Sequence, residues 1–552
     1  MKRILFVLSF FYAGLAQAQW NGNPAIDNAV CVESYQQLNV KHTSDLHGGA
    51  IFVWEDYRSD STNKKSDIYA QRINGAGQTV WQLNGIAICN DTSDQNSPNI
   101  ISDSLGGAII VWQDSRGLKR NIYLQRIDSS GNILWTGNGI GVALRNSDQK
   151  NPKLISDGNH GAVILWQDSA GNIDYDIYAQ RISASGAALW GSGGIGVATG
   201  FGSQVNVKGQ VDNLGNIYAV WQDKRNGGDY DIYAQKLDAG GNAQWTANGK
   251  MICNLGGTQN SPKAAPDYAG GAYFLWQDKR NGLDYDLYAQ RVDQNGNLMW
   301  YTYGVGVAVA SGNQSSIDIT SRGIVNGVVF GWKDARNGAN NIDVYAQKFN
   351  PAGVAQWAAN GIAVANAASN QLNVNVTSDG AGGTFICYQD SSGSNWDIKS
   401  QRVDAAGNLL WAAGGAGIGT AAGPQTDPDI CLSDNGSSIY SFQDKRNGAD
   451  HDIYAFKLDA NGAPVDVRQI RGSEEVVSVY PNPSDGEVNF LWKGNLLRTA
   501  ARLSIYNSLG QKTGEMELRR GAPVHAVYPA GIYYYSLSNG SRAISGKFVI
   551  EN

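Results

Sequence analysis

The stretch that decides the fold is Val220–Asp238, VWQDKRNGGDYDIYAQKLD. Two apolar, aromatic runs of strand-like composition flank a short loop of Asp, Asn and Gly, which is typical of a β-hairpin. The aromatic-x-Asp core of this stretch returns along the chain at spacings of 54 to 58 residues. Its aromatic positions are Trp54, Trp112, Trp166, Trp221, Trp276, Trp332, Tyr388 and Phe442. A regular period of this length predicts a repeat architecture.

Residues 97–146 contain one repeat in full. SPNIISD, GGAIIVWQD and NIYLQRID predict three strands, GNILW predicts the start of a fourth, and Asp128–Asn132 forms the turn before it. A small antiparallel sheet cannot bury both of its faces alone, so it must stack on its neighbours. Four-stranded sheets stacked radially form a β-propeller, and an open solenoid is the alternative.

The repeat region begins and finishes within a unit. QWNGNPAIDNAVCV near the N-terminus resembles VWQLNGIAICN, the tail of a repeat, and this tail is missing after DIYAFKLDANGAPV. The first segment can therefore complete the last sheet, as a closed ring requires. We predict an all-β chain with an eight-bladed β-propeller at 19–466, closed by residues 20–36 against 440–466. Seven blades with an odd unit is the alternative.

The repeated aromatic residues are expected between the blades. A buried aromatic side chain hides on the order of 150–250 Å² of surface, so eight such anchors outweigh surface ion pairs worth about 0–1 kcal/mol each. The Gln and Arg of the repeated YAQR and YAQK segments are expected to pack beside the strand ladder or to bond between blades.

The acidic loop holds one Asp after each aromatic position. These repeat-loop residues are Asp56, Asp114, Asp168, Asp223, Asp278, Asp334, Asp390 and Asp444. In most units a second Asp opens the next strand, as Asp231 does, and two carboxylates at one hairpin mouth repel unless a cation intervenes. Arg225 follows Asp223 by two residues, and Arg280 and Arg446 hold the same place in their units. We interpret the loop as structural, neutralised by Arg or backbone N–H groups, and open to ligand binding as well.

Calcium is the alternative occupant of the loop, because Asp clusters with loop carbonyls suit a hard cation. The loop from Asp168 to Asp176 lacks an Arg, so Asp168, Asp174 and Asp176 are the candidate calcium ligands. No other cofactor is predicted. The cysteines, Cys31, Cys89, Cys253, Cys387 and Cys431, are odd in number and lack a C-x-x-C pair, so we expect buried strand residues rather than a disulfide framework or a zinc site.

No catalytic residue is predicted. Acid–base catalysis needs groups whose environments separate their pKa values, whereas near-copies of one loop provide near-equal environments. The sequence contains none of the sialidase, H-E-x-x-H, G-x-S-x-G or P-loop motifs. The unit of Tyr388 departs most from the pattern, with DSSGSNWDIKSQR making Trp396 and Lys399 candidates for exposure.

The two ends of the chain predict an exported protein. MKRILFVLSFFYAGLAQAQW has a basic start, an apolar run and an Ala16-Gln17-Ala18 cleavage site, which predicts a signal peptide at 1–18. No later apolar run has the length of a transmembrane segment. Residues 467–475 predict a linker, and 476–552 predict a small Ig-like β-sandwich of about seven short strands. The net charge of −6 without a basic stripe argues against a nucleic-acid partner.

The last domain resembles the type A sorting domain of the type IX secretion system (T9SS) of Bacteroidetes. The matching residues are Tyr480, Pro481, Asn482, Pro483, Gly510, Gly531, Ile532, Tyr533 and Lys547. The resemblance implies export through an outer-membrane translocon that reads this domain, followed by cleavage of the domain and attachment of the cargo to surface lipopolysaccharide or its release. None of these residues is expected to be catalytic; turns, sandwich packing and an extended tail for strand-edge recognition are the expected roles.

The predicted function is a non-catalytic binding or adhesion module, secreted or held at the cell surface. A disc with a face of similar loops suits weak, repeated contacts with a glycan or a protein. The alternatives are a polysaccharide-active hydrolase or lyase and a calcium-stabilised structural surface protein. An enzyme would need one distinct polar cluster in the central funnel.

Overall fold

The computed structural model describes residues 20–550 except 61, 63, 170–173, 322–326, 394, 466–475, 481, 483, 485, 494–500, 508–510, 520–521 and 539–542. The chain divides into two compact units, Met1–Val465 and Asp466–Asn552, which are described separately. The predicted signal peptide at 1–18 and the predicted linker at 467–475 lie outside the described residues.

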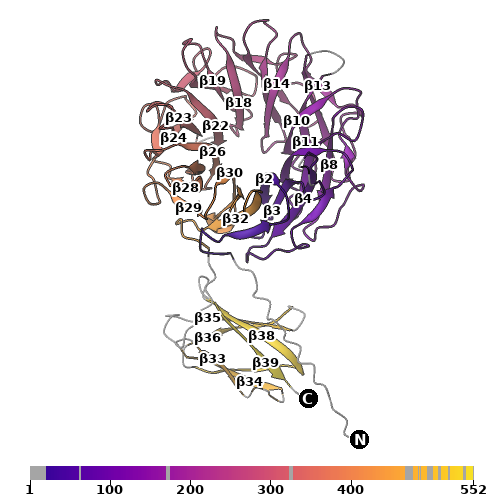
Figure 1. The fold of residues 1–552 in the computed structure, drawn as a ribbon, viewed down its shortest axis with the longest axis vertical. Coiled ribbons are helices and arrows are strands. Elements are labelled where there is room, and N and C mark those ends of the chain that lie inside the picture. Colours follow the sequence, from indigo (N-terminus) through magenta and orange to yellow (C-terminus); the bar gives the residue numbers. More distant parts are fainter. Residues whose placement is uncertain are drawn as a thin grey trace. The chain divides into compact units, whose positions relative to one another are not determined.

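The first unit is a ring of four-stranded antiparallel sheets, and its described residues form eight of them (Figure 1). The first strands lie around the centre of the ring: β2 (Gln37–Ser44), β6 (Gln95–Ser102), β10 (Gln149–Ser156), β14 (Gln204–Val211), β18 (Gln259–Pro266), β22 (Gln314–Ser321), β26 (Gln371–Ser378) and β30 (Gln425–Leu432). The second strands are β3 (Ala50–Asp56), β7 (Ala108–Asp114), β11 (Ala162–Asp168), β15 (Ile217–Asp223), β19 (Ala272–Asp278), β23 (Val328–Asp334), β27 (Thr384–Asp390) and β31 (Ser438–Asp444). The eight-bladed propeller is confirmed.

The third strand of every blade follows in sequence, and so does the fourth strand of the first seven blades. The third strands are β4 (Asp67–Ile73), β8 (Asn121–Ile127), β12 (Asp176–Ile182), β16 (Asp231–Leu237), β20 (Asp286–Val292), β24 (Asp343–Phe349), β28 (Asp397–Val403) and β32 (Asp452–Leu458). The fourth strands are β5 (Ile86–Cys89), β9 (Ile140–Gly141), β13 (Ile195–Ala198), β17 (Lys250–Cys253), β21 (Val305–Ala308), β25 (Ile362–Ala365) and β29 (Ala416–Gly419). A 3-10 turn, η1 (Asp434–Gly436), connects β30 to β31.

The ring closes with a strand from its own beginning. The last sheet has the order β1-β32-β31-β30, in which β1 (Asn28–Cys31) lies antiparallel to β32, with Asn28 opposite Ala455. Just before β1, the indole Nε1 of Trp20 donates to the carbonyl of Gly75 in the first blade, at 3.1 Å. The N-terminal segment therefore joins the last blade to the first, as predicted, and both the open solenoid and the seven-bladed ring are wrong.

The predicted position of the fourth strand is wrong. Within the described residues, GNILW at 131–135 forms one isolated β-bridge to the third strand, between Ile127 and Ile133. The fourth strand, β9, begins later, at Ile140. The cause is Gln125, whose side-chain Oε1 accepts from the backbone N–H of Trp135 at 3.0 Å while its Nε2 donates to the Thr136 carbonyl at 2.7 Å. This side-chain amide takes the place of a backbone peptide and holds the segment away from the third strand.

Aromatic side chains fill the space between blades. The Trp, Tyr or Phe of each aromatic-x-Asp motif is completely buried. Trp112, for example, belongs to a cluster with Ile51 and Val53 of the preceding blade. A second Trp bonds forward: Trp81 Nε1 donates to the Ser129 carbonyl of the next blade at 3.2 Å, and Arg72 of the YAQR-type segment donates to the same oxygen at 2.8 Å. The expected inter-blade bonding of this Arg is confirmed.

The second unit is a two-sheet sandwich with seven strands among its described residues. One sheet has the order β33-β34-β37 and the other β36-β35-β38-β39. The bounds are β33 (Val476–Tyr480), β34 (Glu487–Lys493), β35 (Ala501–Asn507), β36 (Lys512–Leu518), β37 (Val524–Val527), β38 (Gly531–Ser538) and β39 (Ala543–Ile550). Its core includes Phe490, Leu503 and Phe548. The strand number matches the prediction from the alternating sequence pattern.

Candidate functional site

The acidic loop within Val220–Asp238 is a hairpin corner that is held together by hydrogen bonds and an ion pair; we call it the corner of the blade. Asp223 is buried; its Oδ2 accepts from Trp221 Nε1 at 2.8 Å and from the Arg225 guanidinium at 2.6 Å, and its Oδ1 accepts from the Arg225 backbone N–H. The same guanidinium lies over the ring of Tyr233, 3.9 Å from the centroid. The corresponding Arg holds the Asp at Asp56, Asp114, Asp278, Asp334 and Asp444.

In two blades the cation that pairs with the first Asp does not come from the position two residues after it. Asp168 accepts from Ser147 Oγ at 2.5 Å, and Arg145, which reaches it from outside the loop, lies 3.9 Å away. Asp390 is paired with Lys399 at 2.5 Å. Lys399 replaces the Tyr that other blades carry at this point of the third strand, and its bond to Asp390 lowers the pKa of that carboxyl against the effect of burial. Each of the eight repeat-loop carboxylates therefore has a Lys or Arg partner.

In seven hairpins a second Asp lies directly opposite the first, as Asp231 lies opposite Asp223, and in the second blade Asn121 takes this place opposite Asp114. Burial raises the pKa of Asp231 to about 6, and the Asn226 amide donates to it at 2.5 Å. Burial likewise raises the pKa of Asp176 to about 6, with Asp168 and Asp174 adding to the shift. At both second carboxylates the folded structure therefore favours the protonated form.

The calcium candidates share one hairpin. Asp176 lies opposite Asp168, and Asp174 accepts from Ser203 Oγ at 2.9 Å. Across the described residues, no group of three or more His, Cys, Asp and Glu side chains is placed to hold a metal ion. Residues 170–173 of this hairpin lie outside the described residues. Calcium at this loop stays a prediction.

A ring of bulges surrounds one mouth of the central channel. Two residues after the Gln that opens each first strand, the backbone has a φ between 47° and 55°, a left-handed conformation that Asn and Asp adopt more readily than other non-Gly residues. The bulge residues are Asn39, Ser97, Asn151, Asn206, Ser261, Ser316, Asn373 and Asp427. Because Gln204 pairs with Asp223, this mouth lies on the same face as the acidic loops.

The middle residue of the aromatic-x-Asp motif fixes this ring. Glu55 accepts from the backbone N–H of Ser97 in the next blade at 2.6 Å, and Gln113 accepts from that of Asn151 at 2.9 Å. Sequence reasoning missed both the ring and this contact. The available signal was an Asn, Ser or Asp at a constant offset from the Gln of every unit.

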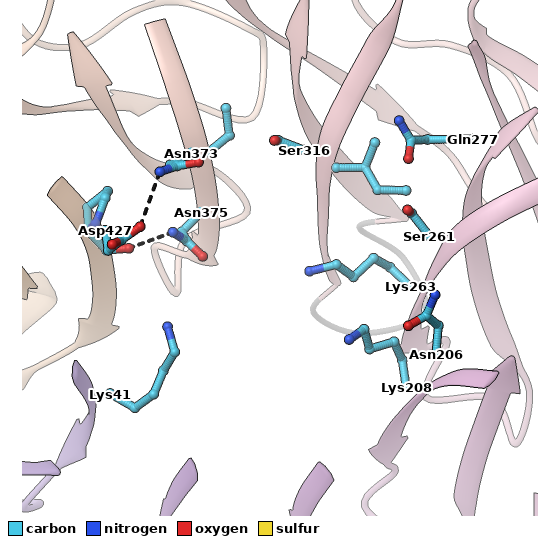
Figure 2. A pocket seen from close by; sticks show the side chains of 13 residues that line it. Lys41, Asn206, Lys208, Ser261, Lys263, Gln277, Ser316, Asn373, Asn375 and Asp427 are labelled. Carbon is cyan, nitrogen blue, oxygen red and sulfur yellow. Dashed lines mark hydrogen bonds between the residues drawn. The ribbon is translucent and has the colours of Figure 1, made fainter. Parts of the chain in front are cut away.

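A second ring lies two residues further along each first strand, past the bulge. Its members are Lys41, Asn99, Lys153, Lys208, Lys263, Asp318, Asn375 and Asp429, in blade order. Five bulge residues and four members of the second ring line a cavity of about 470 Å³: Asn206, Ser261, Ser316, Asn373 and Asp427, with Lys41, Lys208, Lys263 and Asn375. Figure 2 shows Lys41, Lys208 and Lys263 pointing into this cavity, with the amide of Asn206 and the hydroxyl of Ser261 beside the last two. We name the second set of eight the channel ring.

The charges of the channel ring are unevenly matched. Lys263 lies 3.1 Å from Asp318, and Lys41 lies 4.0 Å from Asp429. Lys153 and Lys208 occupy equivalent positions of the first strands β10 and β14 in neighbouring blades, and burial lowers the pKa of both amino groups. No carboxylate of the described residues lies within 4.0 Å of either of these two side chains.

A polar cluster at the closure of the ring has the composition of a catalytic triad without its geometry. His42 Nδ1 contacts Ser441 Oγ at 2.9 Å and lies 3.6 Å from Asp429, while its Nε2 contacts the Ile439 carbonyl at 3.1 Å. A catalytic relay needs the hydroxyl and the carboxylate on opposite ring nitrogens. Ser441 is also completely buried, and burial lowers the pKa of His42. The cluster bonds the last blade to the first.

Trp396 and the cysteines, the remaining residues singled out in the sequence, lie within the framework of the blades. Trp396 is half-buried, and its backbone carbonyl accepts from Gln425 at the start of the next blade, at 2.7 Å. The Cys residues are free thiols; four are buried and Cys431 is partly buried. Cys31 lies 3.9 Å from Asp56, and burial raises the pKa of its thiol.

The sorting residues lie at the edges and the core of the second unit. Tyr480 ends β33 and is partly exposed, and Asn482 Oδ1 accepts from the backbone N–H of Val549 at 2.9 Å. Gly531 begins β38. Pro481, Pro483 and Gly510 lie outside the described residues. Asn482 and Ser484 therefore lie beside the end of the edge strand β39.

The GIYYY motif alternates across β38. Ile532 is exposed, whereas Tyr533 is buried, stacks on Phe548 at 5.3 Å between ring centroids and donates its hydroxyl to the Pro529 carbonyl at 3.0 Å. Lys547 is exposed on β39. The motif thus supplies two core residues, Tyr533 and Tyr535, and two exposed ones, Ile532 and Tyr534, on the opposite face of β38.

The sequence comparisons identify the second unit. Residues 478–551 match the family described as the secretion system C-terminal sorting domain. The first unit is a β-propeller, and the last domain of the chain is a sorting domain of the type IX secretion system; the protein is therefore exported, to the cell surface or beyond it. Among the described residues, no helix has the length and apolar character needed to cross a membrane.

Other comparisons found likeness of structure alone. No relative among curated proteins matches the sequence. An ulvan lyase of a polysaccharide lyase family is 11% identical, covers 71% of this chain and 96% of its own, and has a TM-score of 0.42. A protein of unknown function from Dyadobacter fermentans is 9% identical, covers 78% and 97%, and has a TM-score of 0.34. An endo-arabinase from Bacteroides thetaiotaomicron is 14% identical, covers 50% and 95%, and has a TM-score of 0.25. Likeness at this level says nothing about activity or ligand here.

Proposed function

We propose that the exported propeller is a non-catalytic binding module that takes its ligand at the mouth of the central channel. The observation that carries the proposal is the lining of the 470 Å³ cavity, which consists of Lys, Asn, Gln and Ser side chains with a few apolar ones and one carboxylate, Asp427. Amides, hydroxyls and amino groups bind polar ligands well. This volume lies within the roughly 300–1,000 Å³ typical of small-ligand sites.

The same lining argues against the polysaccharide-active enzyme. Glycoside hydrolysis commonly needs two carboxyl groups that flank the bond, with one of them kept protonated. Asp427 is held by the Gln443 amide at 2.8 Å, and neither a His nor a Tyr is among the residues that line the cavity. The acidic loops supply no substitute, because each of their first carboxylates is bonded to its own cation.

The fold is proposed to need no metal ion. The cation that an acidic loop requires is supplied by an Arg or Lys side chain in every blade, including the blade of the calcium candidates, where Arg145 approaches Asp168. A calcium-stabilised surface protein would instead depend on bound metal for its stability.

The test uses the full exported chain. Immobilised protein is titrated with neutral and acidic polysaccharides, and the same mixtures are assayed for new reducing ends and for unsaturated sugar products. We expect binding of at least one polysaccharide without either kind of product. Product formation that an Asp427→Asn variant abolishes would establish an enzyme and overturn the proposal.

A further inference from the structure

The channel ring divides into a basic and an acidic arc. Blades three, four and five place Lys153, Lys208 and Lys263 at one register position of consecutive first strands, and the blades that follow carry Asp318, Asn375 and Asp429. The eight positions are equivalent in the repeat, so the fold itself does not require a Lys at any of them; Asn99 and Asn375 fill the same place.

Ion pairs within the channel ring neutralise two of its lysines, Lys263 and Lys41. Asp318 takes Lys263, and Asp429 takes Lys41. Asp318 also accepts from the backbone N–H of Val376 at 2.9 Å, which fixes it on the far side of Lys263. Among the described residues, Lys153 and Lys208 remain without a carboxylate partner, at equivalent positions of the neighbouring strands β10 and β14, and both side chains are partly buried. Two neighbouring amino groups repel when both are protonated, and an anion between them removes that repulsion.

We propose that Lys153 and Lys208 form an oxyanion site for an acidic saccharide, whose carboxylate or sulfate group lies between the two amino groups. The bulge ring supplies the remaining contacts: Asn206 and Ser261 line the cavity beside Lys208 and Lys263 and match the hydroxyl groups of a sugar. The inference rests on the proposed function and specifies the chemical class of its ligand.

The charge state of the pair agrees with this assignment. Lys153 faces Lys208, Lys263 and Lys41, and Lys208 faces Lys153, Lys263 and Asp318. Burial is the largest cause that lowers both pKa values. Lys263 and Lys41 add to the lowering at Lys153, where Lys208 opposes it, and Lys153 and Lys263 add to the lowering at Lys208. A bound anion favours the protonated amino groups, so binding must take up protons, and affinity must fall as the pH rises.

The experiment measures the affinity of the full exported chain for three oligosaccharides of equal length at fixed ionic strength, by isothermal titration calorimetry. They are a galacturonate oligomer, a sulfated dextran oligomer and an uncharged dextran oligomer. We expect at least one acidic oligomer to bind at least tenfold more tightly than the neutral one. The two acidic probes distinguish a carboxylate from a sulfate ester as the recognised group.

The decisive variant is Lys153→Met with Lys208→Met. The matched control is Lys119→Met with Lys224→Met, which removes the same charge from two exposed loop positions. We expect the channel variant to lose at least tenfold in affinity for the acidic oligomer, and the control to lose less than twofold. The single variants Lys153→Gln and Lys208→Gln keep a polar side chain and are expected to lose affinity even if the double variant does not fold.

The pH profile provides a second readout. For the wild-type chain, affinity for the acidic oligomer should fall as the pH is raised, whereas any residual binding by the channel variant should stay constant. Equal affinity of the channel and control variants, or no binding of either acidic oligomer, overturns the oxyanion site. Tight binding of uncharged dextran without products overturns it as well but leaves the non-catalytic module standing, whereas product release overturns the proposed function itself.

Discussion

The loop corners and the channel ring are built from the same eight repeats but differ in how much the repeats vary. At the corner, every unit has an Asp and every Asp has a cation, even where the cation must come from a different position. In the channel ring, equivalent positions carry Lys, Asn or Asp. The invariant position bonds strands that every blade needs, and the variable position faces solvent in the channel. Variation among repeats therefore separates the parts that hold the ring from those that select a ligand.

Breaking a corner should have the largest effect on stability. Asp223→Ala removes the acceptor of Trp221 and leaves the half-buried Arg225 without its carboxylate. The loss of one partner of a buried pair costs about 3 kcal/mol, so the free energy of unfolding measured in urea should fall by about that amount. Asp229→Ala, in the exposed part of the same loop, is the control and should cost less than about 1 kcal/mol. Equal losses for the two variants would contradict a structural corner.

Replacing the cation of one corner should lower stability by a smaller amount, and a second substitution should restore it. Lys399→Tyr restores the common third-strand residue in blade seven but leaves Asp390 without its partner, and we expect a loss of about 2 kcal/mol. Adding Ser392→Arg recreates the Arg and Tyr pair of the other corners and should return stability to within about 0.5 kcal/mol of wild type. Chemical denaturation measures both, and failure of the double variant to recover would show that blade seven is not equivalent to the others.

The corner was predictable from sequence, and the channel ring was not, for reasons that concern register. Asp223 and Arg225 are neighbours along the chain, and the hairpin between Asp223 and Asp231 is short, so their contacts follow from local rules. Lys208 faces the channel only because the bulge at Asn206 shifts the alternation of β14 by one residue. A simple period of two therefore misplaces the side chains beyond the bulge.

Ring closure was also predictable, since a tail missing at one end was present at the other. The position of the fourth strand was not predictable, because a side chain decides it. Gln125 provides both hydrogen bonds of a peptide group, and strand propensity contains no sign of that substitution. GNILW has the apolar composition of a strand, yet its neighbour in space is an amide side chain rather than a free ladder edge.

The second carboxylate of a corner should respond to pH in a defined direction. The folded-state pKa of Asp231 is raised to about 6, above the value near 4 of an unfolded Asp. Its stabilising contribution is therefore complete below about pH 4 and is lost as the pH rises through 6. Asp231→Asn keeps the hydrogen-bonding shape without the charge. We expect it to unfold a few degrees higher than wild type at pH 8, and with no difference at pH 4, in thermal scans followed by circular dichroism. A higher melting temperature at both pH values would point to a cause other than ionisation.

Removal of metal should have the smallest effect. A carboxylate corner that contains its own Arg or Lys has no electrostatic need for calcium, and a cation entering beside Asp168 would meet Arg145 at 3.9 Å. Dialysis against EDTA should therefore change the melting temperature of the full chain by less than about 1 °C, and millimolar calcium should not raise it, because only a ligand that binds the folded state shifts unfolding. The comparison becomes sharper with Arg145→Ala, which takes the cation away from blade three alone. If calcium stabilises that variant and not wild type, then the side chain and the ion are alternative ways to relieve the same repulsion, and the Arg or Lys at each corner is what makes the propeller independent of metal.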